Sequence, residues 1–334
     1  MKHVVLIGGG HSHALVLAAY AKAPPNLRLT LIDAQPHATY SGMVPGYLAG
    51  HYTRDQLQID LAQLAARAGA TFLQARVSAI DPIAKRLTLQ SGGDIAYDIA
   101  SLDIGLDHSG PGLPVKPFAT LCDHWDSFVA AGGGHVAILG AGAAGCEMAL
   151  AAAHRLGPRS HVTLIDRAEH IAPQLAPALR HRLTRALNTA GVTLHLGQSI
   201  APKADLQITA TGGKPHRWLH TLTGPQGIPV APTLQTAAHP DLFATGDCAH
   251  FTARPLPKAG VFAVRQAPIL ADNLQALAQG QPLRPYHPQS DYLKLLSLGG
   301  HSAIANWHGL TASGAAFWHL KDRIDRAFMA RFNG

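Results

Sequence analysis

Three consecutive glycines near the start of the chain could bind the diphosphate of a dinucleotide. Gly8 and Gly10 are the two ends of this turn, which follows a short β-branched run and precedes an Ala- and Leu-rich stretch. Because glycine has no Cβ, backbone N–H groups in such a turn can approach a phosphate closely at the positive end of a helix. Asp33 ends a second apolar run about 25 residues later. An acid at that place accepts hydrogen bonds from ribose hydroxyls.

Two histidines follow this turn. His11 comes directly after Gly10, and His13 replaces the third glycine of the usual G-x-G-x-x-G pattern. That glycine normally allows helix and strand to pack closely, so a histidine predicts a wider gap or a side chain that turns elsewhere. The two histidines also resemble a metal-binding pair, but side chains two positions apart at the start of a helix point in different directions. We therefore expect no metal site, and we place His11 among the dinucleotide-binding residues.

A second glycine-rich turn, GAGAAGCE, has all three glycines of the pattern. They are Gly140, Gly142 and Gly145. Asp166 ends the apolar run HVTLID about 26 residues after the first of them. Asp166 favours NADH over NADPH, because a carboxylate binds a free ribose 2′-hydroxyl and repels a 2′-phosphate. Arg167 weakens this preference, since it could hold a phosphate. The stretch ADLQITATGG closes the second unit with a strand and a tight turn that contains Gly212.

The two turns lie in the same succession of elements, namely strand, turn, helix, strand and acid. This internal duplication predicts an α/β protein with two Rossmann-like dinucleotide-binding domains. We expect the first domain to be discontinuous, with residues 1–112 and 236–290, because DLFATGDCAH reads as a return to it. The second domain, residues 113–235, would be nested inside the first. Residues 291–334 would form a short C-terminal segment.

Two acids have both a functional and a structural interpretation. Glu147 lies in the first turn of the second helix, where the helix dipole stabilises a carboxylate, or it lies beside a nicotinamide. Asp247, in ATGDCAH, follows a predicted strand and Gly246. It is either an ordinary turn residue or the acceptor of a hydrogen bond from the ribityl chain of a flavin. The two nucleotide units favour the second interpretation of Asp247.

Composition excludes several classes of protein. With 47% hydrophobic and only 14% charged residues, the chain can bury cores and is not a disordered chain. Its net charge of +7 suits anionic partners, but no dense Lys/Arg run with interleaved aromatics predicts nucleic-acid binding. The three cysteines are far apart, which predicts reduced thiols and a cytoplasmic location. We expect neither a signal peptide nor a membrane-spanning helix, so membrane contact would be peripheral, on the inner face.

Six segments together resemble the flavoprotein disulfide-reductase superfamily in its dehydrogenase branch. They are GGGHSH, TYSGMVPGYLAGHYT, GAGAAGCE, ATGDCAH, PKAGVFAVRQAP and KDRIDRAFMARF. The branch includes type II NADH dehydrogenases and sulfide:quinone oxidoreductases, and the likeness extends to the flavoprotein part of selenide, water dikinase fusions. The resemblance implies that FAD binds to the first unit and NAD(P)H, with NADH favoured, to the second. A histidine in place of the third glycine is usual in that subgroup.

The resemblance also implies roles for individual residues. Gly8, Gly10 and Asp33 would bind the ADP half of FAD, and Gly140, Gly142, Gly145 and Asp166 would bind NAD(P)H. The other implied flavin-site residues are Tyr40 to Pro45 near the isoalloxazine, Val77 at the adenine, Asp247 at the ribityl chain, and Lys258 to Gln266 on the far side of the flavin. Glu147 would lie where nicotinamide and flavin meet.

We expect few catalytic side chains, because a flavin carries out the redox chemistry and the protein supplies position and electrostatics. Lys258 is our candidate donor to the flavin pyrimidine; otherwise it is a solvated loop lysine. The resulting hypothesis is an NAD(P)H dehydrogenase with a quinone as acceptor. The alternatives are a sulfide or selenium-compound oxidoreductase, which would need cysteines such as Cys122 and Cys248, and a non-catalytic FAD/NAD-binding sensor.

The C-terminal segment contains a predicted amphipathic helix. Its apolar face comprises Phe317, Leu320, Ile324 and Phe328, and the charged residues Lys321, Arg323, Asp325 and Arg326 fall elsewhere. Such a helix docks on its own domain or on a partner in a homodimer, or it lies on a membrane surface near the quinone pool.

Overall fold

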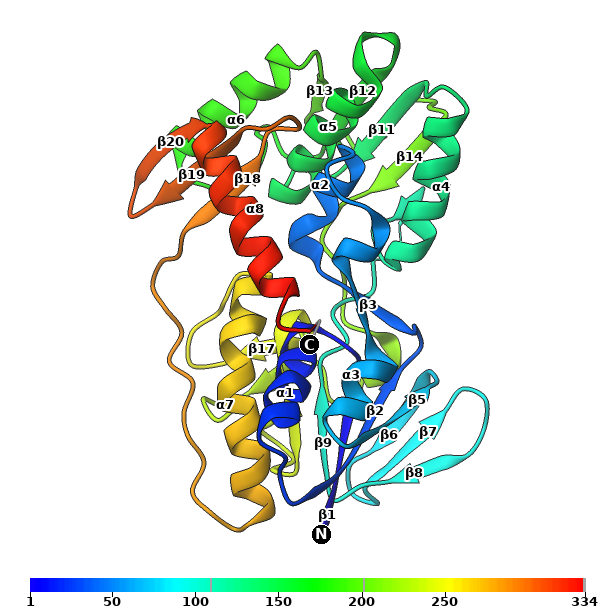
Figure 1. Ribbon diagram of the computed structural model, residues 1–334, viewed down its shortest axis with the longest axis vertical. Coiled ribbons are helices and arrows are strands. Elements are labelled where there is room, and N and C mark those ends of the chain that lie inside the picture. Colours follow the sequence, from blue (N-terminus) through cyan, green and yellow to red (C-terminus); the bar gives the residue numbers. More distant parts are fainter. Residues whose placement is uncertain (109, 201, 333–334) are drawn as a thin grey trace.

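Two five-stranded parallel sheets organise the chain, one above the other in Figure 1. The computed structural model describes residues 1–334 apart from Ser109, Ala201 and residues 333–334. The strands of the first sheet, in spatial order, are β16 (Leu242–Ala244), β9 (Ile99–Leu102), β1 (Lys2–Ile7), β2 (Leu27–Asp33) and β5 (Ala70–Gln74). Those of the second are β10 (Leu113–Pro114), β14 (Leu206–Thr209), β11 (His135–Leu139), β12 (His161–Asp166) and β13 (Thr193–Leu196). The prediction of two Rossmann-like units is confirmed.

The chain leaves the first sheet and later returns to it, so the second unit is nested in the first. Strand β16 comes after all strands of the second sheet, yet it pairs in parallel with β9 of the first, with Leu242 opposite Ala100. β1 lies in the middle of the first sheet and is covered on both faces, as its continuous apolar run predicts. Val4, Val5 and Leu6 are fully buried.

Helices pack on both sheets and join the two units. Around the first sheet lie α1 (His11–Lys22), α3 (Leu61–Arg67) and α7 (Gly260–Ala278), and around the second lie α4 (Phe118–Ala130), α5 (Ala143–Leu156) and α6 (Pro177–Thr189). α1 packs against α7, so segments from opposite ends of the first unit are neighbours. The short helix α2 (Val44–Leu48) packs against α5 and so connects the first unit to the second.

Shorter elements complete the two units. They are β3 (His37–Thr39) with β4 (Gln58–Asp60), the antiparallel sheet of β6 (Val77–Asp81), β7 (Arg86–Leu89) and β8 (Asp94–Ala96), and β15 (Ile228–Val230) with β17 (Ala249–Phe251). Single 3-10 turns are η1 (Ser41–Met43), η2 (Arg54–Leu57), η3 (Gly157–Arg159), η4 (Arg217–Leu219) and η5 (Gly246–Cys248). Among the described residues, no helix combines the length and apolarity needed to span a bilayer.

His13 is accommodated by turning its ring under the glycine turn. Its Nδ1 lies 2.7 Å from the Gly8 carbonyl and its Nε2 lies 2.8 Å from the Ser101 hydroxyl. The imidazole is fully buried and its nitrogens are both in use, so it cannot act as a metal ligand in this conformation. The side chain therefore fills the space between α1 and β9 that a glycine would close.

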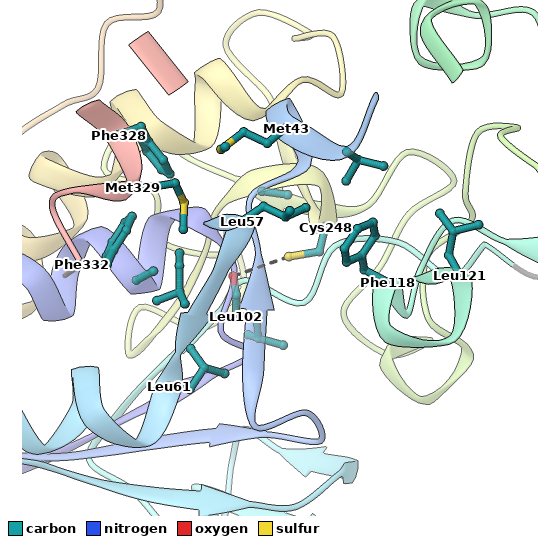
Figure 2. Close-up of a cluster of buried hydrophobic side chains, with 14 of the residues drawn as sticks. Met43, Leu57, Leu61, Leu102, Phe118, Leu121, Cys248, Phe328, Met329 and Phe332 are labelled. Carbon is teal, nitrogen blue, oxygen red and sulfur yellow. Dashed lines mark hydrogen bonds between the residues drawn. The ribbon is translucent and has the colours of Figure 1, made fainter. Parts of the chain in front are cut away.

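The C-terminal segment is a small antiparallel sheet followed by a helix that reaches the first unit. The sheet contains β18 (Lys294–Ser297), β19 (Ala303–Trp307) and β20 (Leu310–Gly314), and α8 (Ala315–Met329) then runs downward in Figure 1 toward α1. Figure 2 shows Phe328, Met329 and Phe332 grouped with Met43 and Leu57 of the first unit. Phe328, Met329 and Phe332 are thus part of the core.

The predicted apolar face of α8 is only partly buried, and an acid outside it is buried. Leu320 and Ile324 are 40% and 44% exposed, whereas Asp325, expected elsewhere, is only 3% exposed. Asp325 is tolerated inside because its carboxylate accepts hydrogen bonds from two neighbouring side chains, which offsets the cost of burying a charge. Phe328 is buried, as the pattern predicted.

Candidate active site

A cleft of about 570 Å³ opens at the carboxyl ends of the first parallel sheet. This is the edge at which open α/β sheets bind ligands. The predicted flavin-site residues that line it are Gly10, His11, Asp33, Gly246 and Asp247. They come from separate places in the chain, namely the turn at the start of α1, the end of β2, and η5 after β16.

Asp33 lines this cleft and holds the glycine turn in place. Its carboxylate accepts from the Gly9 amide at 2.6 Å and from the Gln35 amide at 2.7 Å. Burial raises the pKa of Asp33, and the two backbone donors oppose this shift. Asp33 is therefore fixed beside the glycine turn, in position to accept from a ribose.

The unpaired ring nitrogen of His11, Nε2, indicates that this cleft suits a polar ligand. Its Nε2 is buried without a hydrogen-bond partner among the described residues, and burial lowers the pKa of the ring to about 4, so the ring is neutral. His11 contacts Tyr40 edge-on, with ring centroids 5.6 Å apart, and lines both this cleft and the next. A buried group without a partner costs stability until a ligand satisfies it. The residues present thus fit FAD in this cleft.

A second cleft of about 610 Å³ lies where the two units and α8 meet. Besides His11 and Asp247, which line both clefts, it contains four predicted residues from distant parts of the chain, Tyr40, Pro45, Glu147 and Lys258. Its apolar wall comprises Val44, Val261, Val264, Leu293, Leu295, Ile324 and Phe328. A planar apolar ring can pack against such a wall while polar groups act at its edge.

Glu147 is a partly buried acid of this second cleft. Ser297, in β18, donates its amide to Glu147 Oε1 at 2.8 Å. Burial raises the pKa of Glu147 to about 7; Lys321 opposes the shift and Asp325 adds to it. Glu147 can therefore gain or lose a proton near neutral pH, as a general acid or base requires.

An ion pair on α8, which sequence reasoning missed, completes the cleft. Lys321 Nζ donates to Asp325 Oδ2 at 2.6 Å and to the Gly42 carbonyl at 2.7 Å. The Tyr40 hydroxyl donates to Asp325 Oδ1 at 2.9 Å. The Lys321 and Asp325 side chains are 11% and 5% exposed. The signal in the sequence was the i, i+4 spacing of a lysine and an acid, but that spacing is equally typical of exposed helix faces.

The second glycine turn repeats the geometry of the first. Asp166 accepts from the Ala141 amide at 2.6 Å and from the Ala168 amide at 2.9 Å. Gly142 is the N-cap of α5, the helix that carries Glu147. A Cβ on Gly145 would lie 1.8 Å from the Gly140 carbonyl oxygen, so the close approach of α5 to β11 requires glycine there.

Three other predicted residues lie at the margins of the two clefts, and Lys258 lies in the second cleft. Val77 begins β6 and lines a small cavity beside Asp33, and Gly212 is exposed in the loop after β14. Gln266 is buried, and its Oε1 accepts a hydrogen bond from the Gly246 amide at 2.9 Å. It therefore stabilises the turn that contains Gly246 and Asp247. Lys258 donates to the Ala249 carbonyl at 2.7 Å. Burial lowers the pKa of Lys258, and nearby Asp247 opposes this shift.

The three cysteines are buried thiols. Burial raises the pKa values of Cys122, Cys146 and Cys248 to about 11, 12 and 12. Figure 2 shows the Cys248 thiol directed at the Leu102 carbonyl, to which it donates at 3.5 Å. Because the thiolate is the nucleophile, these cysteines are poorly suited to sulfur chemistry.

Asp103 is a second residue that the sequence analysis missed. It follows β9 directly, lines the first cleft and is 5% exposed. Its Oδ2 accepts the amides of Ser12 and His13 in the first turn of α1, at 2.8 and 3.3 Å. The available signal was an acid at the end of the apolar run YDIASLD, at the carboxyl edge of the sheet.

Comparison with known proteins agrees with this architecture. The family model of the pyridine nucleotide-disulphide oxidoreductases matches residues 2–211. The nitric oxide reductase FlRd-NAD(+) reductase of Aeromonas salmonicida is 33% identical over 209 residues, 54% of this chain and 53% of that protein. The chain thus spans about half the length of that relative. The NADH dehydrogenase-like protein YutJ of Bacillus subtilis is 24% identical over 320 residues, 86% of this chain and 87% of that protein.

Solved structures share the fold over the full length of the chain. The sulfide:quinone oxidoreductase of Aquifex aeolicus superposes with a TM-score of 0.82, covering 99% of this chain and 91% of that one. The sequence identity is 16%, so this likeness concerns the arrangement of elements alone.

Proposed function

The chain belongs to the pyridine nucleotide-disulphide oxidoreductase family, and from this we propose that it is a dehydrogenase that oxidises NADH and delivers the electrons to a quinone. FAD and NAD(P)H are its cofactors. One observation carries the proposal. Glu147, a partly buried acid of the second unit, lines the second cleft together with Tyr40 and Lys258 of the first unit.

We assign the two cofactors to the two glycine turns. FAD would lie in the first cleft, with Gly8, Gly10, His11, Asp33, Gly246 and Asp247 at its ADP half and ribityl chain. NAD(P)H would lie at Gly140, Gly142, Gly145 and Asp166. The corresponding domains are residues 1–112 with 236–290 for FAD and residues 113–235 for NAD(P)H. Asp166 accepts two backbone amides, which keeps its carboxylate at the ribose and favours NADH.

The bound cofactors supply two-electron redox chemistry, and the protein residues position them and manage protons. Glu147 would hold or release a proton at its Oε2, because Oε1 already accepts the Ser297 amide. The apolar wall formed by Val261, Val264 and Ile324 would exclude water from the cleft. Lys258 would place its ammonium near the pyrimidine edge, held by the Ala249 carbonyl.

The wall of the second cleft supports a quinone as acceptor. Its apolar side chains suit a planar ring, and the Lys321 ammonium can donate to a ring oxygen at the edge of the cleft. The sulfide:quinone oxidoreductase fold is shared, so sulfide is the second candidate donor. The three buried thiols disfavour it, because sulfide oxidation on cysteines needs accessible thiolates.

Contact with a membrane surface stays a proposal for the outer side of α8. Leu320 is exposed there beside the exposed Arg323, a combination suited to an acidic lipid surface, whereas the exposed Ile324 lines the second cleft. A cytoplasmic location on the inner face of the membrane and a homodimer stay predictions from the sequence.

The proposed activity is tested by following flavin absorbance after rapid mixing. NADH is expected to bleach the flavin of the purified holoprotein faster than NADPH does, and a soluble ubiquinone analogue is expected to restore the colour. Sodium sulfide in place of NADH should leave the absorbance unchanged. Bleaching by sulfide but not by NADH would favour a sulfide oxidoreductase. No bleaching by any donor would favour a sensor.

Replacement of Lys258 by methionine is expected to slow flavin reduction or reoxidation roughly tenfold or more. The reason is the loss of one charged donor at the flavin, which is worth about 1.5–3 kcal/mol for such a hydrogen bond. The same rapid-mixing experiment measures both half-reactions. Lys294→Met is the matched control, because Lys294 is also partly buried and paired, with Asp291, but lies outside the lining of the cleft. Equal rates in both half-reactions for Lys258→Met and wild type would dismiss the role.

A further inference from the structure

Asp103 lies behind the glycine turn at a place where a diphosphate would add two negative charges. The backbone amides at the start of α1 fall into two groups, which face different acceptors. Ser12 and His13 donate to Asp103 Oδ2, whereas the amides of Gly10 and His11 have no protein acceptor among the described residues and line the first cleft. A diphosphate bound at Gly10 and His11 would therefore share the first turn of α1 with a carboxyl group of the protein.

The contacts around Asp103 leave it no room to move away. A Cβ on Gly10 would lie 2.3 Å from its carboxyl carbon, and a Cβ on Gly246 would lie 2.5 Å from its Oδ1. Glycine at both positions lets the backbone of the cleft close directly over the carboxyl group. Any charge on Asp103 is consequently felt at the diphosphate site at short range.

From this placement we propose that Asp103 is a positioning residue of the flavin site whose carboxyl group must be protonated for tight binding of the FAD diphosphate, so that FAD binding takes up a proton. In its protonated form it would keep one oxygen for the Ser12 and His13 amides and add no charge. In its ionised form it would repel the phosphates.

The electrostatic surroundings of Asp103 support this behaviour. Burial raises its pKa to about 7, the two amides of α1 oppose the shift, nearby Asp247 adds to it and Lys116 opposes it. The other titratable groups that face it are the imidazole of His13 and the thiol of Cys248. His13 is neutral because burial lowers its pKa to about 4, and the pKa of Cys248 is raised to about 12. Asp103 is thus a group beside the diphosphate site whose charge can change around neutrality.

The direction of the pH effect follows from linkage. Below about pH 7 Asp103 is already protonated, and FAD binding takes up no proton there. Above its pKa each binding event must first protonate Asp103, so the dissociation constant for FAD should rise by up to roughly tenfold per pH unit. An asparagine at this position would resemble the protonated acid in shape and charge, so Asp103→Asn should bind FAD with little pH dependence.

The test is the release of FAD from the holoprotein on serial dilution, followed by flavin fluorescence from about pH 6 to 9. Wild type should lose affinity above neutrality, and Asp103→Asn should show a flat profile. Glu147→Gln is the control, because Glu147 also titrates near pH 7 but lies in the other cleft, and it should keep the wild-type slope. A flat wild-type profile, or an unchanged slope in Asp103→Asn, would overturn the proposal.

A second variant keeps the test informative if Asp103→Asn does not fold. Lys116 opposes the rise of the Asp103 pKa, so Lys116→Met should move the loss of FAD affinity to higher pH, whatever it does to the affinity itself. Calorimetry of FAD rebinding in two buffers of different ionisation enthalpy should give an uptake approaching one proton near pH 8. No uptake there, or a midpoint that Lys116→Met leaves in place, would reject the role of Asp103.

Discussion

Replacement of Gly145 by alanine is expected to raise the KM for NADH by at least tenfold and to lower thermal stability, while FAD stays bound. The added Cβ would lie 1.8 Å from the Gly140 carbonyl oxygen, which is backbone and cannot rotate away. α5 must then move off β11, and its first-turn amides leave the place where they would hold the NADH diphosphate. Overpacking of this kind costs about 1–3 kcal/mol. Stopped-flow NADH titration, flavin content and thermal unfolding measure the three effects.

Gly142→Ala is the matched control within the same turn. A Cβ on Gly142 meets nothing within 4 Å, and its φ of −64° is open to alanine. Its unfolding free energy should therefore stay within about 0.5 kcal/mol of wild type. If Gly145→Ala matched wild type in both stability and NADH titration, the close approach of α5 to the turn would be unnecessary for folding and for NADH binding.

The features that the sequence predicted well are those that short stretches encode. Each glycine turn, its preceding strand and the acid that ends the next strand lie within about 30 residues, and local geometry fixes how they meet. Asp33 and Asp166 accordingly accept the amides of their own turns.

The features that the sequence missed depend on partners that are distant in the chain. Asp325 is buried because Tyr40, almost the whole chain length away, donates to it. Helical periodicity alone therefore gave no sign that Asp325 is buried or that Leu320 and Ile324 are exposed. Asp103 was missed for the same reason. The amides that donate to it, those of Ser12 and His13, lie about 90 residues earlier in the chain. Buried polar groups are the residues for which a local hydrophobic pattern gives no information about burial.

Replacement of Asp325 by alanine is expected to destabilise the protein by about 3–5 kcal/mol, because it leaves the buried Lys321 ammonium without its counter-ion and the Tyr40 hydroxyl without its acceptor. Thermal and urea unfolding measure the loss.

The double variant Lys321→Met, Asp325→Leu removes both charges and should recover much of the stability, because apolar side chains of similar size replace a buried pair at little cost. Asp272→Asn is the control, since the Asp272–Arg284 pair is exposed and should contribute less than about 1 kcal/mol. If the pair only anchors α8, the double variant should regain quinone-dependent reoxidation along with stability. If Lys321 also donates to the acceptor, reoxidation should stay slow in a stable protein, while NADH-dependent bleaching proceeds. An Asp325→Ala protein as stable as wild type would show that α8 is held by Phe328, Met329 and Phe332 alone.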